Sequence, residues 1–459
     1  MLNFLKLLFL LLLLLLLMLM YLSNGAAIRP TILHEGANDQ AGDETLSIPQ
    51  NGSPDVSVSD GDVLISKNQL ARMKLTSQRS RSKRQLARYG NKWTNQEVFY
   101  YYNDDVGQEK RDFLRLAMDF ISSQTCVKFT ENSTVPSKVR IYNDGGCGSY
   151  IGMLTEEQGF QQLYFSDSCM IFGTGVHELL HVLGMGHVHI RYDRDDYVTV
   201  NTAEVGTDSN FIMGTYDEYY MPVPYEYGSS MHYSKDSTVV GSIKAKDTSY
   251  WLTLGNRRGG TFYDMKSINW HNDCKCEVEL ECAMGGYSNP ANCSECICPS
   301  GYGGVLCDGF PENSTILEAS EDWKSYSETF GTEGLVTTTF FYSYIIITAP
   351  IDKIIGVRIM NLTNIDCSNR CNRNGLEIKF MGDPRITNPV HCCSESLNHE
   401  YQSKLNPTPV ILYQRSGQST VTIEYRYRDT LKMDEMEESI GKSAWVKTTN
   451  GYDCFEYYL

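Results

Sequence analysis

Two histidines and a glutamate stand at a spacing that could hold a metal ion and move a proton. His177 and His181 are four residues apart in an apolar stretch, so on a helix both imidazoles project from one face and can chelate one Zn²⁺. Glu178 follows the first histidine and could take a proton from a zinc-bound water, whose pKa is lowered toward about 7. The three residues predict hydrolytic chemistry at a zinc ion.

A glycine and a third histidine extend this pattern. Gly184 allows the chain to turn at the end of the helix, because glycine tolerates positive φ, and the turn would bring His187 back as a third ligand. Three protein ligands leave a position open for water and substrate, which is typical of a catalytic zinc site. The alternative, two ordinary core histidines on a buried helix, fits His177 and His181 alone but not the pattern that Gly184 and His187 extend. Met231 stands at the place of the Met-turn that accompanies the extended pattern.

The surrounding sequence predicts a mixed α+β domain that positions these residues. A helix is expected over 174–183, carrying the first two histidines, and strands over 98–102, 139–142 and 163–165. A second helix is expected over 108–124. Its apolar residues recur at spacings of three and four, and they are Phe113, Leu116, Ala117, Phe120 and Ile121.

The stretch from His187 to Asp195, together with Ser230 to Tyr233, resembles the astacin metallopeptidases, a metzincin family. The resemblance implies one zinc ion per chain, with Glu178 as the catalytic base. It implies that Tyr233 is a further zinc ligand that swings away to stabilise the oxyanion. Residues 147–152 resemble the family's edge strand, which implies an endopeptidase cleft that binds an extended peptide.

The same resemblance implies two disulfides, Cys147–Cys169 and Cys126–Cys274. The chain also departs from the family pattern. Val188 replaces the glutamate that usually pairs with the new N-terminus, and Gly148 stands where tryptophan is common. Neither departure removes a metal ligand, so we expect an active enzyme.

The N-terminus predicts a secretory leader. Lys6 precedes an apolar run of fourteen residues, from Leu7 to Met20, and small residues follow it. A bilayer span needs about 20 apolar residues, so residues 1–27 are expected to be a signal peptide, with an uncleaved anchor as the alternative. No later stretch could span a membrane.

Residues 28–84 are polar and are expected to be a propeptide. They end in Arg81-Ser82-Lys83-Arg84, which resembles a proprotein-convertase site with cleavage after Arg84. Asp62 resembles the aspartate by which the family's propeptide binds zinc and keeps the enzyme latent, although Ser59 replaces the usual phenylalanine. An ordinary acidic turn is the alternative for Asp62.

The cysteines predict two further modules. Residues 275–308 resemble an EGF-like module, which implies pairing of the first cysteine with the third, the second with the fourth and the fifth with the sixth. These cysteines are Cys276, Cys282, Cys293, Cys296, Cys298 and Cys307. Spacing alone allows 15 pairings.

Residues 310–430 alternate like strands and resemble a CUB-like β-sandwich. There, Cys367 and Cys393 are expected to replace the family's first cysteine pair. Cys454 is left over in the tail 431–459. Four asparagines lie in glycosylation sequons, Asn132, Asn292, Asn313 and Asn361.

The whole chain of 459 residues carries a net charge of -16 and fifteen cysteines. The acidic charge argues against nucleic-acid binding, and the cysteines indicate an oxidising compartment. We therefore expect a multidomain protein: an α+β metzincin catalytic domain (85–274), a small disulfide-rich EGF-like module and an all-β sandwich. It would be a latent, secreted endopeptidase acting on extracellular proteins, matrix proteins among them, after a convertase activates it. The alternative is a catalytically silent zinc-binding adhesion or matrix protein that acts through the CUB-like module.

Overall fold

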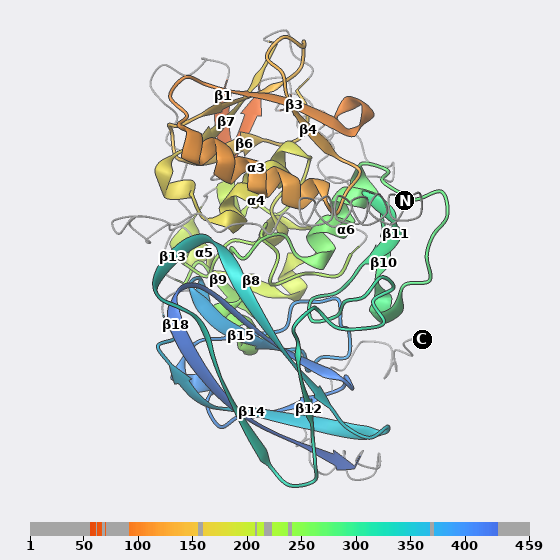
Figure 1. Cartoon of the computed structure of the whole chain (residues 1–459). Helices are drawn as coiled ribbons and strands as arrows, with labels where there is room; N and C mark the ends of the chain where they lie inside the picture. The colour runs from red at the N-terminus through yellow and green to blue at the C-terminus, as the bar shows by residue number, and fades with distance from the viewer. Residues whose placement is uncertain are drawn as a thin grey trace, which may run out of the picture.

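The structure is a computed structural model, and it describes residues 56–60, 62–66, 69, 91–154, 159–206, 209–214, 223–236, 241–367 and 371–429. The expected signal peptide, Arg84, the tail and Cys454 lie outside this part of the chain. No helix within it is long and apolar enough to cross a membrane. Three units follow one another: an N-terminal domain (91–274), a disulfide-rich module (275–308) and a β-sandwich (311–429) (Figure 1).

The N-terminal domain and the segment before it share a seven-stranded sheet of order β1-β2-β6-β7-β5-β3-β4, in which β1 and β2 come from residues 56–66. The strands from β7 to β4 run parallel, whereas β6 is antiparallel to β7 and pairs on its other side with β2. β3, β5 and β7 match the expected strands within two residues at each end. The bounds are β1 (Val56–Asp60), β2 (Val63–Ser66), β3 (Glu97–Tyr102), β4 (Lys128–Glu131), β5 (Val139–Tyr142), β6 (Cys147–Tyr150) and β7 (Gln161–Phe165).

Two packed helices carry the core of this domain. α3 (Gln108–Ser122) and α4 (Phe172–Val182) lie side by side, and a Cβ at Gly175 would come within 3.1 Å of the Phe113 ring. The buried face of α3 is shifted from the expected one, since Leu114 and Met118 are buried whereas Leu116 and Phe120 are only partly so. α4 begins two residues earlier than expected.

The rest of the domain is a long irregular segment that ends in one helix. This helix, α6 (Phe262–His271), begins with a capping box in which the Thr261 hydroxyl accepts from the Asp264 main-chain nitrogen and the Asp264 carboxylate accepts from that of Thr261. The smaller elements before it are β8 (Val198–Val200), α5 (Thr202–Val205) and β9 (Ile243–Ala245).

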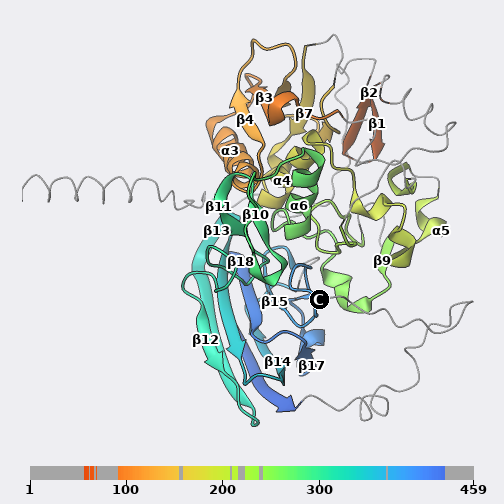
Figure 2. The same cartoon turned by 90° about the vertical axis from the view of Figure 1, so that its right-hand side faces the viewer.

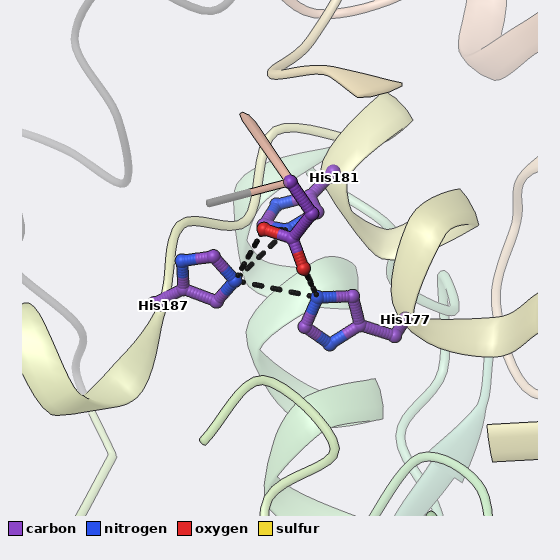
Figure 3. Close-up of side chains that lie close together, drawn as sticks. His177, His181 and His187 are labelled. Carbon is purple, nitrogen blue, oxygen red and sulfur yellow. Dashed lines mark hydrogen bonds and ion pairs between the residues drawn. The ribbon is translucent and has the colours of Figure 1, made fainter. Parts of the chain in front are cut away.

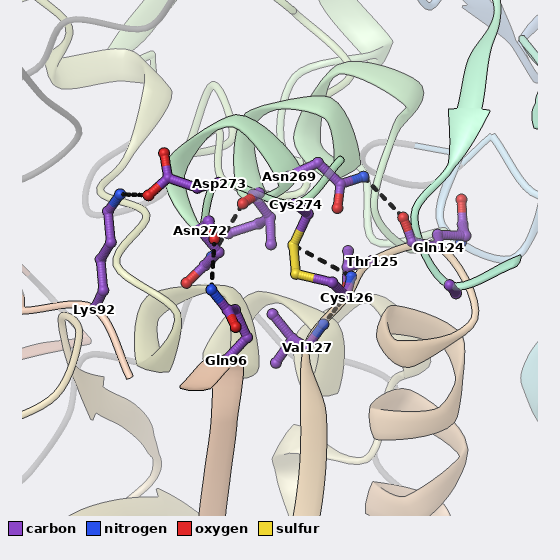
Figure 4. The surroundings of a disulfide bond; sticks show 12 residues. Lys92, Gln96, Gln124, Thr125, Cys126, Val127, Asn269, Asn272, Asp273 and Cys274 are labelled. Carbon is purple, nitrogen blue, oxygen red and sulfur yellow. Dashed lines mark hydrogen bonds and ion pairs between the residues drawn. A yellow bond between two sulfur atoms is a disulfide. The ribbon is translucent and has the colours of Figure 1, made fainter. Parts of the chain in front are cut away.

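A disulfide between Cys126 and Cys274 closes the N-terminal domain (Figure 4). Polar contacts surround it. Asn269 Nδ2 donates to the carbonyl oxygen of Gln124 at 2.8 Å, and Gln96 Nε2 donates to that of Asn272 at 3.1 Å. The end of α6 is thereby joined to the starts of β3 and β4.

The disulfide-rich module is a small hairpin of β10 (Tyr287–Asn289) and β11 (Asn292–Ile297) held by three disulfides. The pairs are those that the resemblance implies: Cys276–Cys293, Cys282–Cys296 and Cys298–Cys307. Asn289 Nδ2 donates to the carbonyl oxygen of Ser123 at 3.0 Å, so the module packs on the N-terminal domain just beyond α3.

The β-sandwich is built around two long antiparallel strands, β13 (Lys324–Thr348) and β18 (Thr408–Asp429). Their pairing shifts register twice, between Gly331 and Phe341, where the ribbon bends. β13 nevertheless runs without a break from Lys324 to Thr348. The other strands are β12 (Thr315–Glu318), β14 (Lys353–Thr363), β15 (Asn374–Ile378), β16 (Val390–His391) and β17 (Glu400–Ser403).

Side chains that alternate along these strands form the sandwich core, including Ile355, Val357 and Ile423. Disulfides Cys367–Cys393 and Cys371–Cys392 lie beside it. In both views the sandwich lies beneath the N-terminal domain, and β10 and β11 lie beside α6 (Figure 1, Figure 2). The expected multidomain fold class is confirmed.

Candidate metal centre

Three imidazoles converge at the end of α4 (Figure 3). His177 and His181 project from one face of the helix. The chain then turns at Gly184 and brings His187 back to them. The Nε2 atoms lie 3.1 Å apart in His177 and His181, 3.2 Å apart in His181 and His187, and 3.3 Å apart in His177 and His187.

The turn requires a glycine at residue 184. Its φ is +103°, and a Cβ there would lie 2.7 Å from Nε2 of His271. Residues other than glycine rarely adopt this φ, and a Cβ here would also collide with the His271 ring. The turn therefore depends on glycine for two reasons.

Hydrogen bonds fix the direction of two of the rings. Nδ1 of His177 lies 2.6 Å from the carbonyl oxygen of Ser230, and Nδ1 of His181 lies 2.7 Å from that of Met185. A carbonyl oxygen only accepts, so each Nδ1 is the donor and each Nε2 points an unshared electron pair into the cluster. Burial lowers the pKa of His177 to about 3, which keeps that ring neutral.

The cluster also includes a carboxylate from the N-terminal segment. Asp62 Oδ2 lies 3.0 Å from His177 Nε2, and Oδ1 lies 3.1 Å from His187 Nε2 and 3.6 Å from His181 Nε2. All four side chains are largely buried. Asp62 thus adds a fourth potential metal ligand to the three histidines.

This arrangement fits a zinc ion. Neutral imidazoles that point electron pairs at one another, with a carboxylate added, repel unless a cation lies between them. Tetrahedral Zn²⁺ with bonds of about 2.0–2.1 Å sets neighbouring ligand nitrogens about 3.3 Å apart, close to the observed spacing. A second group of donors, Cys367, Cys393 and Glu395, includes a disulfide, so its sulfurs are not thiolates.

Glu178 is buried beside the first histidine of the cluster. Neither of its carboxylate oxygens has a hydrogen-bond partner among the described residues. Burial, followed by the charge of Asp62, raises the pKa of Glu178 well above its ordinary value. A buried carboxylate with no fixed partner is free to bond a water or substrate group.

The segment after residue 228 forms the other wall of the centre. Met231 is fully buried, and its carbonyl oxygen accepts from the main-chain nitrogen of Val188 at 2.9 Å. The ring of Tyr233 lies beside His187, with centroids 4.5 Å apart, and stacks on His189 at 4.0 Å.

Two further histidines near the centre bond protein groups instead. Nε2 of His189 lies 2.8 Å from the carbonyl oxygen of Asn210, and Nε2 of His232 lies 2.7 Å from the Tyr225 hydroxyl. Both rings therefore hold neighbouring protein segments and lie outside the group of clustered donors.

Two residues at the centre were not identified from the sequence. Arg257 Nη1 donates to the carbonyl oxygens of Ser230 and His232, at 3.0 and 3.2 Å. Asp264 accepts from both the main chain and the hydroxyl of Ser230. The spacing of Thr261 and Asp264 signals a helix cap, but no local pattern reveals the contact with Ser230.

The comparisons with known proteins agree with this geometry. The family model of the astacin peptidases matches residues 85–272. Zinc metalloproteinase nas-17 of Caenorhabditis elegans is 44% identical over 406 residues, spanning 87% of this chain and 91% of the relative. Zinc metalloproteinase nas-16 of the same organism is 43% identical, spanning 84% and 87%.

Among solved structures, high choriolytic enzyme 1 of Oryzias latipes, a hatching enzyme zinc-protease, is 26% identical with a TM-score of 0.36. The match covers 40% of this chain and 94% of that one. The site and the curated relatives define a zinc metalloendopeptidase. Within that class, the chain belongs to the astacin family, whose members use one zinc ion.

Proposed function

We propose that this chain is a secreted endopeptidase for extracellular proteins, made as a precursor that Asp62 keeps latent. The proposal is carried by the contact of Asp62 with all three histidines of the centre. The same segment continues into β2, which pairs with β6. The N-terminal segment therefore occupies both the metal centre and the strand that would bind a substrate backbone.

The pairing of β2 explains how the segment is held. The main-chain nitrogen of Ser149 donates to the carbonyl oxygen of Asp62 at 3.0 Å, and Leu64 is fully buried against Tyr150 and Tyr164. Without β2, β6 would be the edge of the sheet. An extended peptide could then add to it by main-chain hydrogen bonds.

The catalytic roles follow from the positions of the side chains. His177, His181 and His187 would hold the zinc ion, which supplies a Lewis acid for the scissile carbonyl and for water. Glu178 takes the proton of the attacking water and returns it to the leaving amine. Tyr233 donates a hydrogen bond to the oxyanion as it forms.

Several features support secretion and processing. The seven disulfides of the described residues suit an oxidising compartment. Asn292, Asn313 and Asn361 are exposed and Asn132 is partly so, which leaves all four accessible to glycosylation. A signal peptide over 1–27 and convertase cleavage after Arg84 complete the proposal, and cleavage would free the segment that carries Asp62.

The test uses precursors that cannot be processed. Full chains with Arg84→Ala, with and without Asp62→Ala, are assayed on a short fluorogenic peptide beside wild-type protein cleaved after Arg84. We expect Arg84→Ala to be silent and the double variant to regain activity. If the double variant stays silent while the cleaved protein is active, Asp62 does not maintain latency.

Secretion is tested on the culture medium of expressing cells. N-terminal sequencing is expected to find chains that begin at residue 28 and at Gln85. Retention of the protein in the cell membrane would overturn the signal-peptide assignment.

A further inference from the structure

The β-sandwich contacts the N-terminal domain on both sides of the segment that carries Met231. The residues that make its hydrogen bonds to Glu226, Tyr250, Thr253 and Arg258 lie in one stretch of the sandwich, residues 377–390, which we call the docking segment. Tyr250 donates its hydroxyl to the carbonyl oxygen of Thr387 at 3.1 Å. Thr253 accepts from the main-chain nitrogen of Val390 at 3.1 Å. All four of these residues are buried, so the two units share a packed interface.

One contact lies just before the Met231 segment. The carboxylate of Glu226 accepts from the main-chain nitrogen of Gly228, at 3.0 Å, and from that of Thr387, at 3.3 and 3.2 Å to its two oxygens. The approach is close, because a Cβ at Gly228 would lie 2.5 Å from Cγ2 of Thr387. The docking segment thus fixes the turn from which the Met231 segment starts.

The second contact lies after that segment. Arg258 Nη2 donates to Glu377 Oε2 at 3.1 Å, and its guanidinium lies 4.5 Å from the centroid of the Tyr413 ring. Burial alone would raise the pKa of Glu377, but the charges of Lys379 and Arg258 outweigh it and lower the pKa. Glu377 is therefore an anion in a buried ion pair that joins the two units.

Arg257, the residue before Arg258 in the chain, connects this ion pair to the metal centre by hydrogen bonds. Its side chain holds the carbonyl oxygen of Ser230, which is also the acceptor for Nδ1 of His177. Its main-chain oxygen accepts from the nitrogen of Gly173, at the start of α4, at 3.0 Å. A Cβ at Gly173 would lie 2.1 Å from that oxygen. One residue thus links the helix that carries two histidines to the Met231 segment.

We propose that the β-sandwich positions the metal centre, through Glu377 on Arg258 and Thr387 on Glu226. Glu377 and Thr387 are positioning residues, since neither touches the histidines. The sandwich then serves the hydrolysis of every peptide, including one too short to reach its surface. This role goes beyond the choice of substrate or location.

The test compares variants of the processed full chain on a short fluorogenic peptide. We expect Glu377→Gln to lower kcat by about 10-fold, with KM little changed, because small displacements of reacting groups cost rate rather than binding. We also expect Glu377→Gln to lose zinc to a competing chelator at a lower chelator concentration than the wild-type protein does. Arg258→Gln should lower kcat in the same way, and the double variant should be no worse than Glu377→Gln alone, since both substitutions break the pair of Arg258 and Glu377.

Glu424→Gln is the matched control. Glu424 pairs with Arg358 between strands of the sandwich, away from the docking segment, with Arg358 Nε donating at 2.7 Å. Its loss should leave peptide hydrolysis and zinc retention unchanged. If Glu377→Gln also leaves both unchanged and affects only large protein substrates, the sandwich is a substrate-binding surface and the proposal is overturned.

If Glu377→Gln does not fold, two substitutions at the close contact of Gly228 and Thr387 test the proposal instead. Gly228→Ala is expected to lower kcat because its methyl group meets Thr387, and adding Thr387→Gly should restore the rate. Absence of this restoration in a folded double variant would contradict control of the centre by the docking segment.

Discussion

Asp264 accepts hydrogen bonds from the main-chain nitrogen of Ser230 at 3.0 Å and from its hydroxyl at 3.3 Å, although 34 residues separate the two. The same carboxylate accepts from the Ser229 hydroxyl at 2.6 Å and from the main-chain nitrogen of Thr261 at 3.0 Å. One buried side chain therefore caps α6 and holds the segment whose carbonyl oxygen orients His177.

Replacing this carboxylate should weaken both the fold and the metal centre. In Asp264→Asn the amide nitrogen cannot accept, so buried donors lose their partner, which typically costs about 1–3 kcal/mol. We expect urea unfolding to show a loss of this size, together with faster loss of zinc to a chelator. Asp112→Asn on the exposed face of α3 is the control and should change stability by less than about 0.5 kcal/mol. Equal effects of the two substitutions would contradict the role of Asp264.

Glu178→Gln should separate catalysis from metal binding. The amide keeps the size of the side chain but cannot take a proton, so kcat/KM should fall at least about 100-fold. Zinc content, measured by atomic absorption, should stay at one ion per chain, because Glu178 is not among the clustered donors. His181→Ala is the comparison and should lose both zinc and activity. Loss of zinc from Glu178→Gln would show instead that the carboxylate helps to hold the metal.

The stability of the chain should carry a pH dependence that is due to Glu226. Burial raises the pKa of this carboxyl to about 8 from an ordinary 4.5, against the opposing hydrogen bonds of Gly228 and Thr387. Between these two values the folded chain keeps a proton that the unfolded chain has released. The contribution of Glu226 to stability therefore falls as the pH rises through this window.

Glu226→Gln removes this titrating carboxyl, so the Tm values of the variant and of the wild-type protein are compared at several pH values. With both proteins saturated with zinc, the Tm of the variant relative to wild type should rise steadily from pH 5 to about pH 8.5. A Tm difference that does not vary with pH would show that Glu226 titrates near its ordinary value.

The disulfide between Cys126 and Cys274 should contribute more to stability than the shorter ones. It spans 148 residues, whereas Cys298–Cys307 spans 9. In the chain-entropy model the long loop is worth about 5 kcal/mol and the short one about 3 kcal/mol. Replacing each pair by alanines and measuring urea unfolding should therefore show the larger loss for Cys126 and Cys274. The reverse order would mean that local contacts, such as those in Figure 4, outweigh loop entropy.

Much of the metal centre could be predicted because its signals are local. The spacing of His177 and His181 places both on one face of a helix whatever the rest of the chain does. Gly184 signals the turn, since its φ of +103° suits glycine alone. Three strands of the N-terminal domain, β3, β5 and β7, were predicted within two residues for the same reason, as β-branched and aromatic residues mark them.

The buried face of α3 was predicted less well. Leu114 and Met118 of α3 are buried, whereas the expected Leu116 and Phe120 lie at the edge of the buried stripe. Periodicity locates an apolar stripe, but its centre is set by the partner, here α4 and the ring of Phe113 against Gly175. That partner lies some sixty residues further along the chain.

By itself, then, the sequence predicted the three clustered histidines, the proposed base Glu178 and the family, because these depend on residue types at short fixed spacings. Only the tertiary structure decided what holds them. Arg257 bonds Ser230, Asp264 bonds the same residue from α6, and Glu377 reaches Arg258 from another unit of the chain. These partners are brought together by packing, and single polar residues at such separations leave no periodic signal in the sequence. The contact between the β-sandwich and the N-terminal domain belongs to this second kind.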